Sequence, residues 1–562
     1  VVYRQVTARA RWKGGGGMDE TVIWRNISIG APDAEADTDL LDACFVDTGT
    51  LESIQSTESH ASIVLGRTGQ GKSAVLLRLM AVEKNSVQIR PLELAFRFVE
   101  NSTVIRFFED AGVNLNLFYR LLWRHVLVTE LIRKKFVIRD QNALDRWLTA
   151  ISSKFKRDTA KSAAIEYLRR WGQSFWQETE VRLVEITEKI ESELTASLEG
   201  SALAAKMRGA AGEKLSETER AEVVSRGASV VNKIQIADLN RVMQILAEEA
   251  FKDEQNKHFI VIDSLDEDWV SSAAKLRLIR ALIEEVRTFR SELRNAKVVV
   301  ALRQDLIERV FHETRDGGFQ EEKYESYYAR LKWDRDDLES VVRMRINEIF
   351  RRKYTSKKLS IEDIFPRARG GDSPIDYMLE RTLHRPRDII AFTNECLRIA
   401  EKRPRISWAA IVDAEATYSR KRRNALVDEW LSSLPSINIS LELLQGVNET
   451  FTRSSITDER LEPVVTQLAT SDKEDETIRL CRKAFEPKSS VTMAQLLSSI
   501  IRSLYHVGAI GIKYSPESPF LWSFRDDPDI SMGDAKRVVS VKVHKMLWKA
   551  LDIRTGSAFQ RR

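Results

Sequence analysis

The sequence GRTGQGKS at residues 66–73 has the residue types and spacing of a loop that binds nucleotide phosphates. Its glycines let the backbone turn sharply, so that N–H groups point inward, and a helix starting directly after the loop adds its positive end. We expect Lys72 to neutralise the β- and γ-phosphates and the Ser73 hydroxyl to reach Mg²⁺. The predicted nucleotide-binding residues are Gly66, Arg67, Thr68, Gly69, Gln70, Gly71, Lys72, Ser73 and Ala74.

A second group of residues has the character of a metal-binding strand end. Residues 258–262 are a largely apolar run that ends in Asp263. A carboxylate at the carboxyl end of a buried strand can hold Mg²⁺, so Ser73 and Asp263 are the predicted metal ligands, with ATP and Mg²⁺ as cofactors. Asp266 and Glu267 follow within one turn, and one of them is placed to orient or activate the attacking water. We favour Glu267 and keep Asp266 as the alternative.

Both groups need a sheet to bring them together. Residues 62–65 read as the strand before the loop, and residues 74–79 have apolar residues at helical spacing. Residues 87–98 and 296–306 read as further strands, and residues 118–132 as a buried helix. We therefore predict an α/β fold: a P-loop NTPase core with a parallel sheet, a large helical insertion, a helical lid and a C-terminal winged-helix domain.

The predicted domain boundaries follow from the spacing of these elements. The core spans 18–336 and includes a helical insertion at 120–250, of which residues 188–222 read as a mobile arm. The helical lid spans 337–405, and the winged-helix-like domain spans 406–562. That last domain is inferred from a helix at 491–508 that ends in Gly508, followed by strands at 509–514 and 520–526.

Composition excludes several classes of protein. Of the 562 residues, 43% are hydrophobic and 30% are charged, which excludes a disordered chain, and no apolar run is long enough for a membrane span. The three cysteines are far apart and form no zinc or disulfide pattern, which favours a cytoplasmic location. Residues 1–17 have four basic and no acidic residues before Met18, and we interpret them as a non-native or mis-called extension. Without them the net charge of +5 falls to +1, so overall charge does not support nucleic-acid binding.

Five segments together resemble a bacterial P-loop ATPase family of poorly defined function. They read GRTGQGKS, VIDSLDEDW, LKWDRDDL, HRPRDIIAFTN and VHKMLWKAL. The layout is similar to origin-recognition AAA+ ATPases, and the strand with Asp263 is similar to that of NACHT and other STAND proteins. Many such ATPases are found in mobile-element or phage-defence loci. Ser264 departs from the pattern, because it stands where an AAA+ protein has its catalytic Glu.

The resemblance implies roles for several arginines. In AAA+ and STAND folds the strand beside the Asp263 strand ends in a residue that senses the γ-phosphate, which points to Arg303 or Gln304 here. The RPRD segment is similar to the sensor 2 element of the AAA+ lid, with Arg387 as the preferred candidate and Arg385 as the second. Arg330 lies in a predicted loop before the helix that Trp333 and Asp334 open. We favour a solvated side chain there, and the alternative is an arginine that acts on the nucleotide of a neighbouring subunit in a homo-oligomer. The predicted catalytic residues are Lys72, Asp263, Glu267, Asp266, Arg303, Arg387 and Arg385.

Three functions are compatible with these residues. The first is an ATP-hydrolysing switch of AAA+ or STAND type that relays its nucleotide state to an effector or regulatory protein, in phage defence for example. The second is a DNA-binding initiator or loader. It needs basic residues on the helix before the wing, where only Arg502 and His506 occur, with Lys513 on the wing. The third is a nucleotide-binding scaffold with negligible turnover. No membrane partner is expected.

Overall fold

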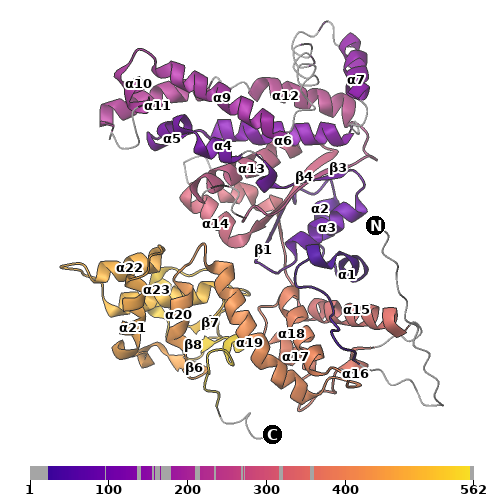
Figure 1. Ribbon diagram of the computed structural model, residues 1–562, viewed down its shortest axis with the longest axis vertical. Coiled ribbons are helices and arrows are strands. Elements are labelled where there is room, and N and C mark those ends of the chain that lie inside the picture. The colour runs from indigo at the N-terminus through magenta and orange to yellow at the C-terminus, as the bar shows by residue number, and fades with distance from the viewer. Residues whose placement is uncertain are drawn as a thin grey trace, which may run out of the picture. The chain divides into compact units, whose positions relative to one another are not determined.

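In the computed structural model the chain forms two compact units (Figure 1). One unit is residues 33–333, and the other combines residues 23–32 with residues 334–556. The structure describes residues 23–556 except 95, 136–140, most of 155–178, 209–214, 233–235, 268–269, 271, 315–319 and 355–359. The extension predicted at 1–17 lies outside the described residues.

The unit at 33–333 is built on a five-stranded parallel sheet with the order β2-β3-β4-β1-β5. Its strands are β1 (Ile63–Gly66), β2 (Ser86–Ile89), β3 (His258–Ile262), β4 (Ala296–Arg303) and β5 (Tyr328–Arg330). Parallel neighbours require crossover connections, and helices supply most of them. The mixed α/β fold with a parallel sheet is therefore as predicted.

The helices of this unit lie on both faces of the sheet. They are α1 (Thr38–Ala43), α2 (Thr50–Gln55), α3 (Lys72–Val82), α4 (Phe96–Asn101), α5 (Thr103–Asp110), α6 (Asn116–Lys135), α7 (Gln141–Lys154), α9 (Thr179–Leu198), α10 (Ala202–Arg208), α11 (Glu217–Asn232), α12 (Ile236–Ile245), α13 (Ser272–Glu292) and α14 (Gln304–Glu313). Because strand side chains alternate, Val64, Val261 and Val299 share one core with α2 and α3, whereas Ile260 and Val298 share the other with α6 and α13.

The helical insertion is part of the second core. Leu194, Leu198 and Leu203 are buried in the same apolar cluster as the sheet residues, so these parts of 188–222 pack against the core, unlike the mobile arm that we predicted. A buried ion pair between Arg124 of α6 and Glu285 of α13 (2.7 Å) also joins the insertion to the core.

Two strand predictions at the sheet need correction. The second strand ends at Ile89, well before residue 98, because Pro91 starts a short 3₁₀ turn and α4 follows. Proline has no N–H to donate to a neighbouring strand. The three-residue strand β5 was not predicted, since it is too short for a periodic pattern. It pairs with β1 and contains Arg330, which we had placed in a loop.

The second unit begins with helices α15 (Arg335–Tyr354), α16 (Ile361–Ile364), α17 (Pro374–Leu379), α18 (Pro386–Ile399) and α19 (Trp408–Trp430). Residues 23–32 pack within it, with Ile23 and Ile29 fully buried. The backbone of Ile23 exchanges hydrogen bonds with Lys402 and Arg403 (2.7 and 2.9 Å). The core predicted at 18–336 therefore includes a segment that folds with the other unit.

The C-terminal part of this unit contains a three-stranded antiparallel sheet with the order β6-β8-β7. The helices and strands of this C-terminal part are α20 (Ile437–Ser440), β6 (Thr450–Thr452), α21 (Asp458–Ala469), α22 (Glu476–Ala484), α23 (Met493–His506), β7 (Ile510–Lys513), α24 (Met532–Arg537) and β8 (Ser540–Val543). The strand predicted at 520–526 is wrong: only Leu521 pairs, with Ile512, and the next residues form a turn closed by Asp526 on the Trp522 N–H (2.8 Å). β8 takes its place beside β7.

No helix in the described part of the chain is both long enough and apolar enough to cross a membrane.

Candidate nucleotide-binding site

The sheet brings the predicted phosphate loop and Asp263 to the same edge. β4 lies between β1 and β3, and its register pairs Arg303 with Gly66 and Val300 with Ile262. The loop at 67–71, Arg303 and Asp263 therefore all emerge at the carboxyl ends of adjacent strands. Ligands of open α/β sheets bind at this edge.

The loop between β1 and α3 is closed by its own residues. Gly69 and Gly71 have φ angles of +80° and +94°, which only glycine adopts readily. The Gln70 side chain folds back and accepts a hydrogen bond from the Arg67 N–H (2.7 Å). A Cβ atom at Gly66 would lie only 2.9 Å from that Gln70 oxygen, so a side chain at this position would displace the Gln70 amide.

Lys72 starts α3 and turns its amine back over the loop. Its Nζ donates hydrogen bonds to the carbonyl oxygens of Gly66 and Arg67 (3.2 Å each). The pKa of Lys72 is lowered, chiefly because the amine is buried. The charges of Asp266 and Asp263 raise this pKa, whereas the charge of Arg303 lowers it. The lysine is therefore close enough to these predicted site residues for their charges to act on it.

Arg303 is held at this edge by carboxylates. It makes a bidentate pair with Asp305 (3.0 and 2.9 Å), and Asp266 lies 3.9 Å away. Gln304, the alternative sensor, is the first residue of α14 and bonds to Glu308 along that helix (3.2 Å). Asp305, which we did not predict as a site residue, thus positions the sensor candidate.

The turn after β3 carries the candidate catalytic carboxylates. Asp263 is buried, and one of its carboxylate oxygens accepts a hydrogen bond from the Ser264 N–H (2.8 Å). Ser264 has a φ of +61°, and its carbonyl accepts from the Glu267 N–H (3.2 Å), which closes the turn. Asp266 and Glu267 are both exposed.

The donor set fits a nucleotide-bound Mg²⁺ ion. Such an ion usually takes only one or two protein oxygens and completes its shell with phosphates and water. Ser73 in the first turn of α3 and Asp263 at the end of β3 supply oxygens of that kind. Among the described residues no group of three or more His, Cys, Asp and Glu side chains is arranged to hold a metal by itself.

The predicted lid arginines belong to the other unit. Arg385 is 1% exposed and pairs with Asp388 and Glu429 (3.0 Å each), and Arg422 contacts the same two acids (3.2 and 3.3 Å). Arg385 therefore ties α18 to α19, because a buried charge is stable only with such partners. Its role as the second sensor candidate stays a prediction. Arg387 is half-buried, and its Nε donates to the Pro32 carbonyl (3.2 Å).

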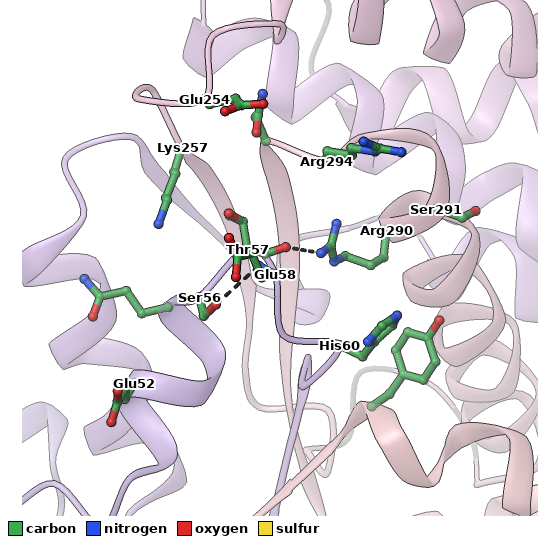
Figure 2. A pocket seen from close by; sticks show the side chains of 13 residues that line it. Glu52, Ser56, Thr57, Glu58, His60, Glu254, Lys257, Arg290, Ser291 and Arg294 are labelled. Carbon is green, nitrogen blue, oxygen red and sulfur yellow. Dashed lines mark hydrogen bonds between the residues drawn. The ribbon is translucent and has the colours of Figure 1, made fainter.

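A separate pocket of about 850 Å³ lies at the amino edge of the parallel sheet (Figure 2). Most of its lining residues come shortly before β1, β3, β4 or β5 in the chain. On one side of the pocket, Arg290 donates a hydrogen bond to the Thr57 carbonyl. The lining contains three basic residues, Lys257, Arg290 and Arg294, and three acidic ones, Glu52, Glu58 and Glu254. The balanced charges favour no single class of ligand, and the pocket is distinct from the phosphate loop.

Comparisons with known proteins add little to this picture. A family model described as the FunZ-associated C-terminal helical domain matches residues 336–427, less than half of the chain. Among solved structures, a Walker-type ATPase of Pyrococcus abyssi is 11% identical, with a TM-score of 0.34 over 88% of this chain and 96% of that one. No curated protein matches.

Proposed function

We propose that the chain binds Mg-ATP at the carboxyl edge of its parallel sheet and hydrolyses it. The observation that carries this proposal is the β1-β4-β3 arrangement, which puts the phosphate loop, Arg303 and Asp263 on adjacent strand ends. Lys72 neutralises the phosphates, and Ser73 and Asp263 hold the metal. Glu267 or Asp266 orients the attacking water, and Arg303 contacts the γ-phosphate.

The direct test is phosphate release by wild type, Lys72→Ala and Asp263→Asn. We expect both variants to lose activity, because one removes the phosphate-binding charge and the other the metal-binding charge. Calorimetry with Mg-ATP accompanies the assay. Binding without turnover in wild type favours a nucleotide-binding scaffold, and no binding rejects the nucleotide site altogether.

We also propose that ATP turnover acts as a switch read by a protein partner. The order helix, strand, helices, strand, helix, strand and the β6-β8-β7 sheet support a winged-helix-like module. The two candidate DNA-binding residues of α23 lie beside acids of the module: Arg502 pairs with Glu476 and Asp529 (2.9 and 2.7 Å), and His506 lies 3.7 Å from Asp529. This neutralisation favours a protein partner over DNA, since binding to phosphates needs available positive charge.

DNA binding is the alternative, and a salt series of filter binding distinguishes the two. Binding to duplex or single-stranded DNA that weakens steeply with salt would support the initiator or loader role.

Two further proposals are a role in phage defence and a homo-oligomer with Arg330 at its interface. Measurement of the protein's size in solution with and without ATP tests the oligomer. Within its own unit Arg330 pairs with Glu325 (3.0 Å).

A further inference from the structure

Trp333 contacts the outside of the phosphate loop. Its indole N–H donates a hydrogen bond to the Gln70 carbonyl (2.8 Å), and its ring carbon Cζ2 would lie 3.6 Å from a Cβ atom at Gly71. The side chain is half-buried, and Trp333 is the last residue of the unit that carries the loop. Trp333 is not among the predicted site residues, because it lies 263 residues from Gln70 in the chain.

The hydrogen bond fixes the orientation of one peptide in the loop. In a trans peptide the C=O and the following N–H point to opposite sides. Trp333 holds the Gln70 carbonyl on its own side of the loop, so the Gly71 N–H points to the opposite side, away from Trp333. Within the described residues no acceptor takes that N–H. Inward N–H groups are the ones that bind phosphate oxygens in such loops.

We propose that Trp333 is a positioning residue of the phosphate site, which holds the peptide between Gln70 and Gly71 in the orientation that phosphate binding needs. The inference rests on the proposed nucleotide binding. The Gln70 side chain supports the loop from one side through its bond to Arg67. Trp333 supports it from the other, so the loop is ordered for binding before the nucleotide arrives.

The test is calorimetric titration of Mg-ADP into the full chain with wild-type sequence, Trp333→Phe or Trp408→Phe. Phenylalanine keeps much of the ring but removes the N–H donor. We expect Trp333→Phe to bind roughly two- to tenfold more weakly, as the loss of one hydrogen bond predicts. Trp408 is a matched control, because its indole donates a bond of similar length to the Arg367 carbonyl (2.9 Å). Its substitution should leave the affinity unchanged.

The outcomes separate the inference from the proposed function. If wild type does not bind Mg-ADP, nucleotide binding itself is rejected. If wild type and Trp333→Phe bind equally well, only the role of Trp333 is rejected. A purely structural role would lower the melting temperature of Trp333→Phe without a selective loss of affinity.

A measurement on wild type covers the case in which Trp333→Phe does not fold. Mass spectrometry can follow radical oxidation of the Trp333 peptide with and without Mg-ADP. We expect the nucleotide to reduce oxidation in wild type but not in Lys72→Ala, because phosphate bound to the Gly71 N–H also holds the Gln70 carbonyl against Trp333, so the half-buried ring is released to solvent less often. Equal oxidation in all samples would contradict the proposal.

Discussion

The charges around Lys72 determine how its amine can act on phosphate. Burial favours the neutral amine, whereas Asp266 and Asp263 favour the charged one. Arg303 would repel Lys72 more strongly if Asp305 did not pair with it at 2.9 Å. The acids at this edge thus help to keep two cations close together, where a triphosphate needs both.

The choice between Glu267 and Asp266 can be decided by two amide substitutions. We expect Glu267→Gln to lower the rate of hydrolysis by about 100-fold or more while Mg-ATP still binds, because the general base is lost and the phosphate contacts are not. Asp266→Asn is the matched variant at the other exposed carboxylate of the turn. Single-turnover phosphate release measures both, and a larger loss in Asp266→Asn would reverse the assignment.

Helices α18 and α19 are joined by a buried network of charges. Removing one partner from such a network leaves the others unpaired, so we expect Arg385→Met to lower the free energy of unfolding by about 3–5 kcal/mol. Arg387→Ala loses one bond to a backbone carbonyl and should cost about 1 kcal/mol. Urea unfolding followed by circular dichroism measures both values.

Arg385→Met and Arg387→Ala also test the sensor assignment. If Arg387 contacts nucleotide, Arg387→Ala loses ATPase activity while it keeps most of its stability. Stability of Arg385→Met equal to wild type would contradict the structural role given to that arginine.

Elements with strong local signals could be predicted from sequence. The strand, loop and helix around GRTGQGKS, the strand before Asp263 and helix α6 lie where the residue patterns indicate. The β2-β3-β4-β1-β5 order could not be derived, because strand order depends on contacts between distant segments and β5 has only three residues. The strand expected at 520–526 failed because Trp522 covers Gly511, whose missing side chain leaves room for the ring.

Site residues that act through long-range contacts were also missed. Trp333 reads as the start of a helix, and only the fold shows its bond to Gln70. Asp305 stands two residues after Arg303 in the sequence, but the residue pattern does not indicate that the two side chains pair.

At the scale of the whole molecule, the second unit is built from two separate segments, residues 23–32 and 334–556, with residues 33–333 between them in the sequence. Ile29 of the first segment is fully buried, and its carbonyl accepts a hydrogen bond from Arg345 (2.9 Å). We therefore expect Ile29→Ala to destabilise the second unit by about 2–5 kcal/mol. Val412→Ala, at a side chain 42% exposed on α19, is the control and should change stability by less than about 0.5 kcal/mol.

Hydrogen exchange of peptides from α15 and α18 locates the effect of Ile29→Ala. Faster exchange in these helices is expected, since Arg345 lies in α15 and Asn394 of α18 accepts a hydrogen bond from the Ile29 N–H (2.8 Å). Exchange equal to that of Val412→Ala would show that residues 23–32 contribute little to the unit.

The division of the second unit between two distant segments also has a consequence during translation. Ile29 leaves the ribosome 316 residues before Arg345. Translation proceeds at about 5–20 residues per second, so residues 23–32 are synthesised roughly 15–60 s before the helices that bury them. During that time Ile23, Ile27 and Ile29 lack the helices that bury them, so the nascent chain exposes apolar side chains that favour aggregation.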